Sequence, residues 1–341
     1  APFGLKGWQV AFMAVGIPGM LLALLTWQIK EPPRGLSEGL ISSESKNPLK
    51  ETFKELVGLT PFGLVGSDNF KKELSINIIF TVLIFLASYY LYVLTGDFLQ
   101  WTAFGIGVYV ICNWIHGLKN RDPVAFLLIF KSKALLLGLL SFPFITFVTY
   151  ALGAFGPSFY IRNFSMTATE VGIIYGLITV FGSMIGVICG GILGDKLRET
   201  YVNGKLYLIM ASAVLTGVTA IGFIHSENLV ASFTWKFVYH IASTAWLGCA
   251  ASTVTELVLP RLRAVASAFF ILMLSMIGLA LGPYLTGMVS DIYINSGLLP
   301  GPALKNAMTL TLVVLVLPFG LLAVACKYLK NDEAEIYEKA R

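Results

Sequence analysis

Three ionisable side chains lie within one apolar stretch of the sequence, residues 233–258: Lys236, His240 and Glu256. A charged side chain at the centre of a bilayer costs about 2.5–3.5 kcal/mol on insertion scales, so such residues mark candidate solute or proton sites. His240 follows Lys236 by one helical turn and can line a cavity on the same face, although a structural histidine is an equal interpretation. Lys236 lies near one end of the stretch, where a lysine can extend its amine to the membrane surface.

Polar residues on the same stretch and on two others complete the candidate cavity. One of these stretches contains Pro143, which removes a backbone donor and kinks a helix, so a gate and a static kink are equal interpretations. The candidate cavity residues are Thr146, Thr149, Tyr150, Tyr175, Thr179, Lys236, Tyr239, His240, Ser243 and Trp246.

Hydrolytic, nucleotide-driven and metal-dependent chemistry lack their usual patterns. The four cysteines show no CxxC spacing, and the three histidines lie on separate predicted elements. Neither an HExxH motif nor a Walker loop occurs. We therefore expect no enzymatic activity, no cofactor and no metal, while a metal site assembled by tertiary contacts stays open.

The elements that must position these side chains are membrane helices. Apolar residues make up 56% of the chain and charged residues 13%, with a mean hydropathy of +0.78, which is far from the composition of a soluble domain. A span needs about 20 apolar residues, and strands of a barrel would alternate. The sequence predicts an all-α polytopic membrane protein with about nine spans, at residues 8–29, 74–94, 98–118, 134–160, 171–193, 206–224, 233–258, 264–288 and 307–326.

Lysine and arginine are concentrated in every second loop and in the tail. The opposite loops hold only Lys6, Arg162 and Lys305. Because positive loops stay in the cytoplasm, the N-terminus is predicted outside and the C-terminus inside. The net charge of +5 reflects this bias, and we expect a lipid bilayer rather than a nucleic acid as the partner.

The segments between the spans predict a linker and a hairpin. Residues 30–73 are polar and contain four prolines, and within them residues 48–57 have the spacing of an amphipathic surface helix. Only three residues separate the spans 74–94 and 98–118, which predicts an antiparallel hairpin, and residues 122–133 predict an interfacial helix.

Glycines four residues apart line one face of the fifth span. This spacing lets a second backbone approach closely, and both static packing and a sliding interface fit it. One run is Gly182, Gly186, Gly190 and Gly194, and a second is Gly172 and Gly176.

The end of that span resembles a known loop motif. The segment from Gly191 to Arg198 reads GILGDKLR and resembles the G-x-x-x-D-[RK]-x-G-[RK]-[RK] signature of the major facilitator superfamily. It departs from the signature at Arg198, which takes the second glycine position, and at Glu199 and Thr200, where basic residues are usual.

Three further stretches resemble the spinster-like branch of that superfamily. Residues 7–35, 156–162 and 263–291 are similar to its helices 6, 7 and 11. The resemblance implies a major-facilitator-like helical bundle that begins at helix 6, carries two inserted helices and continues through helices 7–12. It implies five segments: 1–35, the last helix of the N-terminal half; 36–73, a cytoplasmic linker; 74–133, an inserted hairpin and interfacial helix; 134–330, the C-terminal six-helix half; and 331–341, a cytoplasmic tail.

On this alignment the first five helices are absent, and we expect the chain to be a fragment. Its partner would then be the missing N-terminal helices. A complete nine-span protein is the alternative. The resemblance also implies a bacterial inner membrane.

The resemblance implies a gating role for Asp195 and Arg198. We add Glu256 as a partner for Arg198 or Arg263, with Asp195 facing the start of the helix near residue 264. The expected charge cluster is Gly191, Asp195, Lys196, Arg198, Glu256 and Arg263.

The expected function is secondary active transport, as a symporter or antiporter, of a small organic or amphiphilic, lipid-like solute with proton coupling. This expectation follows from the resemblance alone. A non-transporting membrane sensor or assembly subunit is the alternative.

Overall fold

The computed structural model describes residues 6–30, 49, 57, 60, 70–121, 123–259 and 262–340. Within these ranges the secondary structure is helical, with no strand, which confirms the predicted all-α class. The chain divides into two units, Ala1–Ser45 and Lys46–Arg341, and each is described by itself. The predicted surface helix at 48–57 and most of the linker lie outside the described residues.

The described residues of the first unit form one helix, α1 (Gly7–Thr26), which is long and apolar enough to cross a membrane. Gln9 caps its start, because the backbone amide of Lys6 donates to Gln9 Oε1 at 2.8 Å. Pro18 lies inside the helix.

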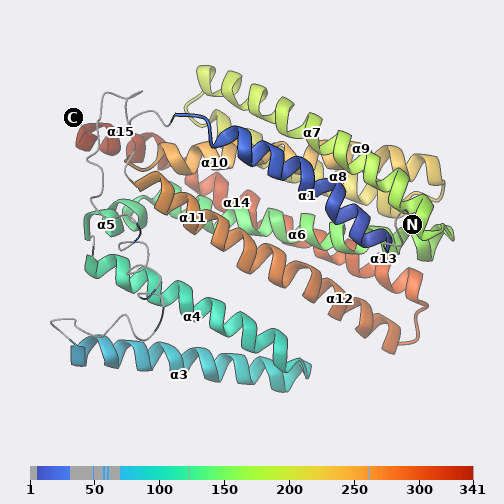
Figure 1. Ribbon diagram of the computed structural model, residues 1–341, viewed down its shortest axis with the longest axis horizontal. Coiled ribbons are helices and arrows are strands. Elements are labelled where there is room, and N and C mark those ends of the chain that lie inside the picture. The colour runs from blue at the N-terminus through green and yellow to red at the C-terminus, as the bar shows by residue number, and fades with distance from the viewer. Residues whose placement is uncertain are drawn as a thin grey trace. The chain divides into compact units, whose positions relative to one another are not determined.

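Helices α3 to α15 make up the described part of the second unit (Figure 1). They are α3 (Phe70–Thr95), α4 (Phe98–Arg121), α5 (Pro123–Lys131), α6 (Lys133–Phe164), α7 (Ala168–Thr200), α8 (Gly204–His225), α9 (Leu229–Thr244), α10 (Trp246–Glu256), α11 (Arg263–Met273), the π-helix η5 (Leu274–Leu279), α12 (Ala280–Asn295), α13 (Pro300–Thr311), the 3₁₀-helix η6 (Leu312–Leu315), α14 (Val316–Ala325) and α15 (Leu329–Ala340).

Eight helical segments in the described part are long and apolar enough to span a membrane. The remaining predicted span, 233–258, consists of two shorter helices, α9 and α10, which are joined at Ala245. Side-chain donors compete for carbonyls at this join: Thr244 Oγ1 donates to His240 O at 2.8 Å, and Trp246 Nε1 donates to Ser243 O at 3.0 Å. Such bonds weaken the regular helical ladder locally.

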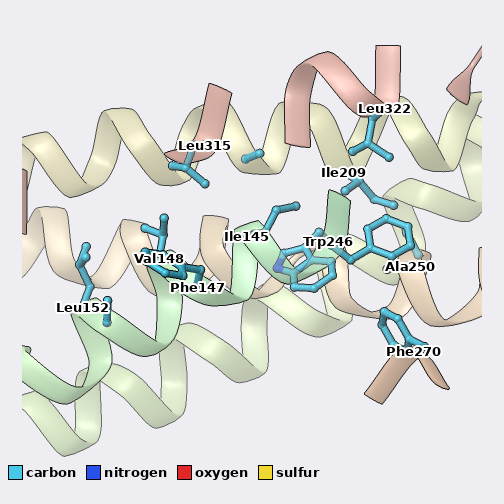
Figure 2. Packing of buried hydrophobic residues seen from close by; sticks show 14 of the residues in the cluster. Ile145, Phe147, Val148, Leu152, Ile209, Trp246, Ala250, Phe270, Leu315 and Leu322 are labelled. Atoms are coloured by element: carbon cyan, nitrogen blue, oxygen red, sulfur yellow. The ribbon is translucent and has the colours of Figure 1, made fainter. Parts of the chain in front are cut away.

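Helix α6 supplies much of the core of the second unit. It packs against α14, η5, α12 and α13, and near its middle seven of the eight residues from Ser141 to Val148 are buried. Aromatic contacts join three helices, because Phe142 stacks on Trp246 and meets Phe270 edge to face. Figure 2 shows Trp246 and Phe270 among the buried residues of this core. Ring pairs in these geometries stabilise the packing by about 0.5–1.5 kcal/mol each.

The glycine face of α7 packs against α9 and α10. A Cβ on Gly182 would lie 2.8 Å from the Cβ of His240, and one on Gly190 would lie 2.6 Å from the Ala245 carbonyl carbon. A Cβ on Gly172 or Gly176 would meet nothing within 4 Å. Only the longer glycine run therefore makes a close helix contact in this structure.

Helices α3 and α4 form a hairpin with a polar seam between them. Asn77 Nδ2 donates to Asn113 Oδ1 at 2.9 Å, and Tyr109 donates to Asn77 Oδ1 at 2.7 Å. Nearer one end, Glu73 is bonded to both His116 and Asn120. Hydrogen bonds between side chains stabilise helix pairs in a membrane modestly, by about 0.6 kcal/mol each on average.

Candidate functional site

Two residues of the predicted charge cluster, Asp195 and Glu256, lie beside the same lysine, Lys205. Glu256 accepts a hydrogen bond from Lys205 Nζ, so the expected pairing of Glu256 with Arg198 or Arg263 is wrong. Asp195 is 4.0 Å from the same Lys205 nitrogen, and its carboxylate is 77% exposed to solvent. The lysine side chain is only 10% exposed, so Glu256 and Asp195 compensate a nearly buried charge.

Arg198 pairs with α15, most of which lies in the predicted cytoplasmic tail, residues 331–341. Its Nη2 donates to Glu333 Oε2 of α15 at 2.6 Å, and its Nη1 donates to Val202 O. Arg198 also lies in the last turn of α7, where a positive charge is favoured by the helix dipole.

Two further acidic residues attach α15 to the start of α6. Asp332 Oδ2 accepts from Ser132 Oγ and from the backbone amide of Ala134, both at 2.8 Å. Lys131 donates to Glu335 at 2.8 Å, and this hydrogen bond and the nearby carboxylate charge raise the pKa of Lys131. Helix α15 therefore connects the start of α6 with the end of α7 at one end of the bundle. We call this region the charged end; its residues are Asp195, Arg198, Lys205, Glu256, Asp332, Glu333 and Glu335.

Gly191, Lys196 and Arg263 complete the predicted cluster. Gly191 is half-buried, and a Cβ there would meet nothing within 4 Å. Lys196 is exposed. Arg263 Nε donates to Thr255 O at 3.1 Å, which ties α11 to the end of α10.

Lys236 is 0% exposed, so the interpretation that its amine extends to the membrane surface is wrong. Three aromatic rings surround its Nζ: Phe223 at 4.2 Å, Tyr239 at 4.4 Å and Tyr175 at 5.0 Å from the ring centroids. We call Lys236 and these rings the aromatic cage. The cage brings together α7, α8 and α9, because Tyr175 and Phe223 come from the two neighbouring helices.

His240 lies beside the cage and is held by Thr179. The two side chains are 3.0 Å apart, and the Thr179 hydroxyl also bonds Tyr175 O at 2.8 Å. The imidazole makes edge contacts with the rings of Tyr175 and Tyr239. Five predicted cavity residues, Tyr175, Thr179, Lys236, Tyr239 and His240, are therefore neighbours.

The other predicted cavity residues lie elsewhere in the packing. Ser243 and Trp246 are buried at the join of α9 and α10. Thr146 donates to Pro143 O at 2.8 Å and packs against Gly278 of η5, while Thr149 donates to Thr146 O at 3.1 Å. Tyr150 is 43% exposed.

The sequence did not identify several residues of the charged end and the aromatic cage as functional candidates. Lys205 begins α8, where a positive charge is disfavoured by the helix dipole, and that local conflict was a signal that it has a partner. Glu333 gave no such signal, because its partner is 135 residues away in the sequence. Phe223 was one apolar residue among many. Within the described ranges, no three or more His, Cys, Asp or Glu side chains are grouped so as to hold a metal ion.

Comparison with known proteins identifies relatives of this chain. No protein-family model matches it. It is 30% identical over 201 residues to an MFS-type efflux pump of Mycolicibacterium smegmatis, an alignment that covers 58% of this chain and 45% of the pump. It is 26% identical over 173 residues to protein spinster of Drosophila melanogaster, covering 47% of this chain and 28% of that protein. Protein spinster homolog 3 of Homo sapiens is 24% identical over 210 residues, covering 56% and 41%.

The chain thus spans less than half the length of the curated relatives it matches. Among solved structures, it is similar to a bacterial homolog of the human lysosomal transporter Spinster in an inward-facing, occupied conformation, at 23% identity and a TM-score of 0.48, covering 72% of this chain and 58% of that one. The inward-facing, unoccupied form matches at 21% identity with a TM-score of 0.47, covering 71% and 59%. The sequence relatives and the membrane-spanning helices agree with the resemblance found in the loop motif: this chain is similar to an MFS-type efflux pump and to spinster proteins.

Proposed function

We propose that the chain takes part in secondary active transport by alternating access and moves a small organic or amphiphilic, lipid-like solute coupled to protons. The observation that carries this proposal is the 30% identity to an MFS-type efflux pump over 201 residues. The chain would supply the C-terminal six-helix half, residues 134–330, with the hairpin of residues 74–133 as an insertion.

The charged end supplies the gate in this proposal. Arg198 and Glu333 join α7 to α15, and Lys205 and Glu256 join α8 to α10, so opening this end of the bundle requires at least one of these pairs to separate. For partly buried ion pairs such as these, the cost of desolvation offsets much of the attraction between the charges, so the closed gate is not held tightly. The distribution of lysine and arginine supports placing this end in the cytoplasm, in a bacterial inner membrane.

Flux through proteoliposomes tests the transport proposal. The purified full chain is reconstituted into phosphatidylcholine liposomes with an imposed pH difference, and uptake of three radiolabelled amphiphiles with one alkyl chain is followed: decyl phosphate, decyl glucoside and decyltrimethylammonium. We expect faster accumulation than in protein-free liposomes for at least one amphiphile, and loss of that accumulation when a protonophore removes the pH difference.

Variants of the gate sharpen this experiment. Arg198→Gln and Glu333→Gln each remove the pair between α7 and α15, so both should change the uptake rate in the same direction, whereas Lys330→Gln on the exposed face of α15 should not. If the rate in the presence of the chain equals that of empty liposomes for all three amphiphiles, the transport proposal is contradicted and the sensor or assembly-subunit alternative is favoured.

A further inference from the structure

The amine of Lys236 is fully enclosed, and in the described part of the chain Nζ has no hydrogen-bond partner and no ion pair. Its neighbours are the faces of Phe223, Tyr239 and Tyr175. A ring face attracts a cation by about 2 kcal/mol when both are desolvated. Burial of an unpaired ion costs several kcal/mol, and rings offer no acceptors for the N–H groups, so the cage offsets only part of this cost.

Two more buried donors lie in the same cage without partners. The hydroxyl groups of Tyr175 and Tyr239 are both buried and make no hydrogen bond to any described residue. Tyr160, which contacts the ring of Tyr175, differs from them because its hydroxyl is bonded to Ser232 Oγ at 3.0 Å. The lack of partners is therefore specific to the tyrosines that surround Lys236. Buried polar groups are normally satisfied, so such a concentration of unsatisfied groups requires an explanation.

The neighbouring pair of Thr179 and His240 does not supply a hydrogen-bond acceptor for Lys236 from the Thr179 hydroxyl. The Thr179 hydroxyl donates its one proton to Tyr175 O, so its oxygen accepts from Nε2–H of His240. The cluster as a whole thus combines an ammonium group and two phenolic donors with no carboxylate bonded to any of them among the described residues. An anionic oxygen group is a ligand that accepts hydrogen bonds both from an ammonium group and from phenolic hydroxyl groups.

We propose that Lys236, Tyr175 and Tyr239 form a binding site for the anionic headgroup of an amphiphile, a carboxylate or a phosphate. This inference rests on the proposed transport function, because it specifies the class of solute. Tyr175 provides the entry: it keeps slight surface exposure, whereas Lys236 has none, and its hydroxyl rests against Gly156 of α6. Movement of the Tyr175 ring away from Gly156 would open the cage to the headgroup.

Binding can be measured without transport. The full chain in nanodiscs of neutral phosphatidylcholine is titrated with decyl phosphate, decanoate, decyl glucoside and decyltrimethylammonium, and the dissociation constant is taken from the rise in unfolding temperature with ligand concentration. We expect a saturable rise with the two anions and none with the glucoside or the cation. The anion that binds more tightly identifies the headgroup as phosphate or carboxylate.

Variants locate the site. Lys236→Met should weaken anion binding at least tenfold, and Tyr175→Phe and Tyr239→Phe should each weaken it about tenfold, the factor that corresponds to one hydrogen bond to a charged group. Tyr160→Phe and Lys330→Met are matched controls that should leave the dissociation constant unchanged. The two phenylalanine variants keep the test decisive if Lys236→Met does not fold.

Two results would overturn the site: an equal rise in unfolding temperature with decyl glucoside, or unchanged anion affinity in the Lys236 and tyrosine variants. The same experiments distinguish a failure of the proposed transport function from a failure of the proposed site. If decyl phosphate binds through Lys236 but no amphiphile crosses proteoliposomes, the site stands and transport is contradicted. If uptake occurs and Lys236→Met leaves every uptake rate unchanged, transport stands and the site is contradicted.

Discussion

Two lysines show how differently the same side chain is used in this protein. Lys205 is nearly buried and has two carboxylate neighbours, whereas Lys236 is fully buried among rings. The sequence identified Lys236 as a candidate because a charge in an apolar stretch is unusual. It could not show that the amine is enclosed, because Tyr175 and Phe223 reach it from other helices and only tertiary packing determines their positions.

The ion pair between Lys205 and Glu256 predicts an unequal effect of removing either partner. Glu256→Met leaves a lysine that is 10% exposed without its closest carboxylate, while Lys205→Met leaves a carboxylate that is 39% exposed and can be hydrated. We expect Glu256→Met to lower the free energy of unfolding by about 2 kcal/mol and Lys205→Met by about 1 kcal/mol. Thermal unfolding in detergent measures both, with Glu199→Met on the exposed surface as the control. The opposite order would contradict the burial described for this pair.

Helices in this protein are held by two kinds of contact, close backbone packing and end capping, and the sequence predicted only the first. The run from Gly182 to Gly194 was correctly expected to pack closely, since the spacing of four is a local pattern. The join at Ala245 was not predicted, because Thr244 is also bonded to Ser183 on another helix. Helix α15 was assigned to a tail, because its sequence is mostly polar and its partners lie far away in the chain.

The glycine face predicts opposite effects of one substitution at two positions of α7. Gly190→Ala places a methyl group against the backbone of Ala245, so overpacking should lower the free energy of unfolding by about 1–3 kcal/mol. Gly172→Ala has open space and should raise it by about 0.5–1 kcal/mol, because alanine favours a helix. Thermal unfolding of the two variants provides the comparison. Equal effects would show that the face is not closely packed.

Asp332 predicts a local effect at the start of α6. Asp332→Ala removes the acceptor of the Ala134 amide, while Ser132 Oγ continues to accept from Leu135 at 3.1 Å. Loss of a helix-capping acceptor costs about 1 kcal/mol, so hydrogen exchange of the Ala134 amide should become about fivefold faster. Lys330→Ala serves as the control on α15. Unchanged exchange at Ala134 would mean that α15 does not cap α6.

For the molecule as a whole, composition alone predicted the class of fold. The apolar content and the length of the apolar stretches led to an all-α membrane protein, and the structure agrees. The two functional clusters could not be assembled in the same way. Each one joins residues from three or more helices, and the sequence contains the residues but not the packing that brings, for example, Arg198 to Glu333.

The proposed function requires that this chain couple the movement of a solute to the movement of protons. The most direct measurement is the internal pH of proteoliposomes, read from a trapped pH dye, after a gradient of decyl phosphate, decyl glucoside or decyltrimethylammonium is imposed without any initial pH difference. We expect at least one of these gradients to change the internal pH faster than it does in protein-free liposomes. An internal pH that follows the protein-free liposomes for all three solutes would contradict it.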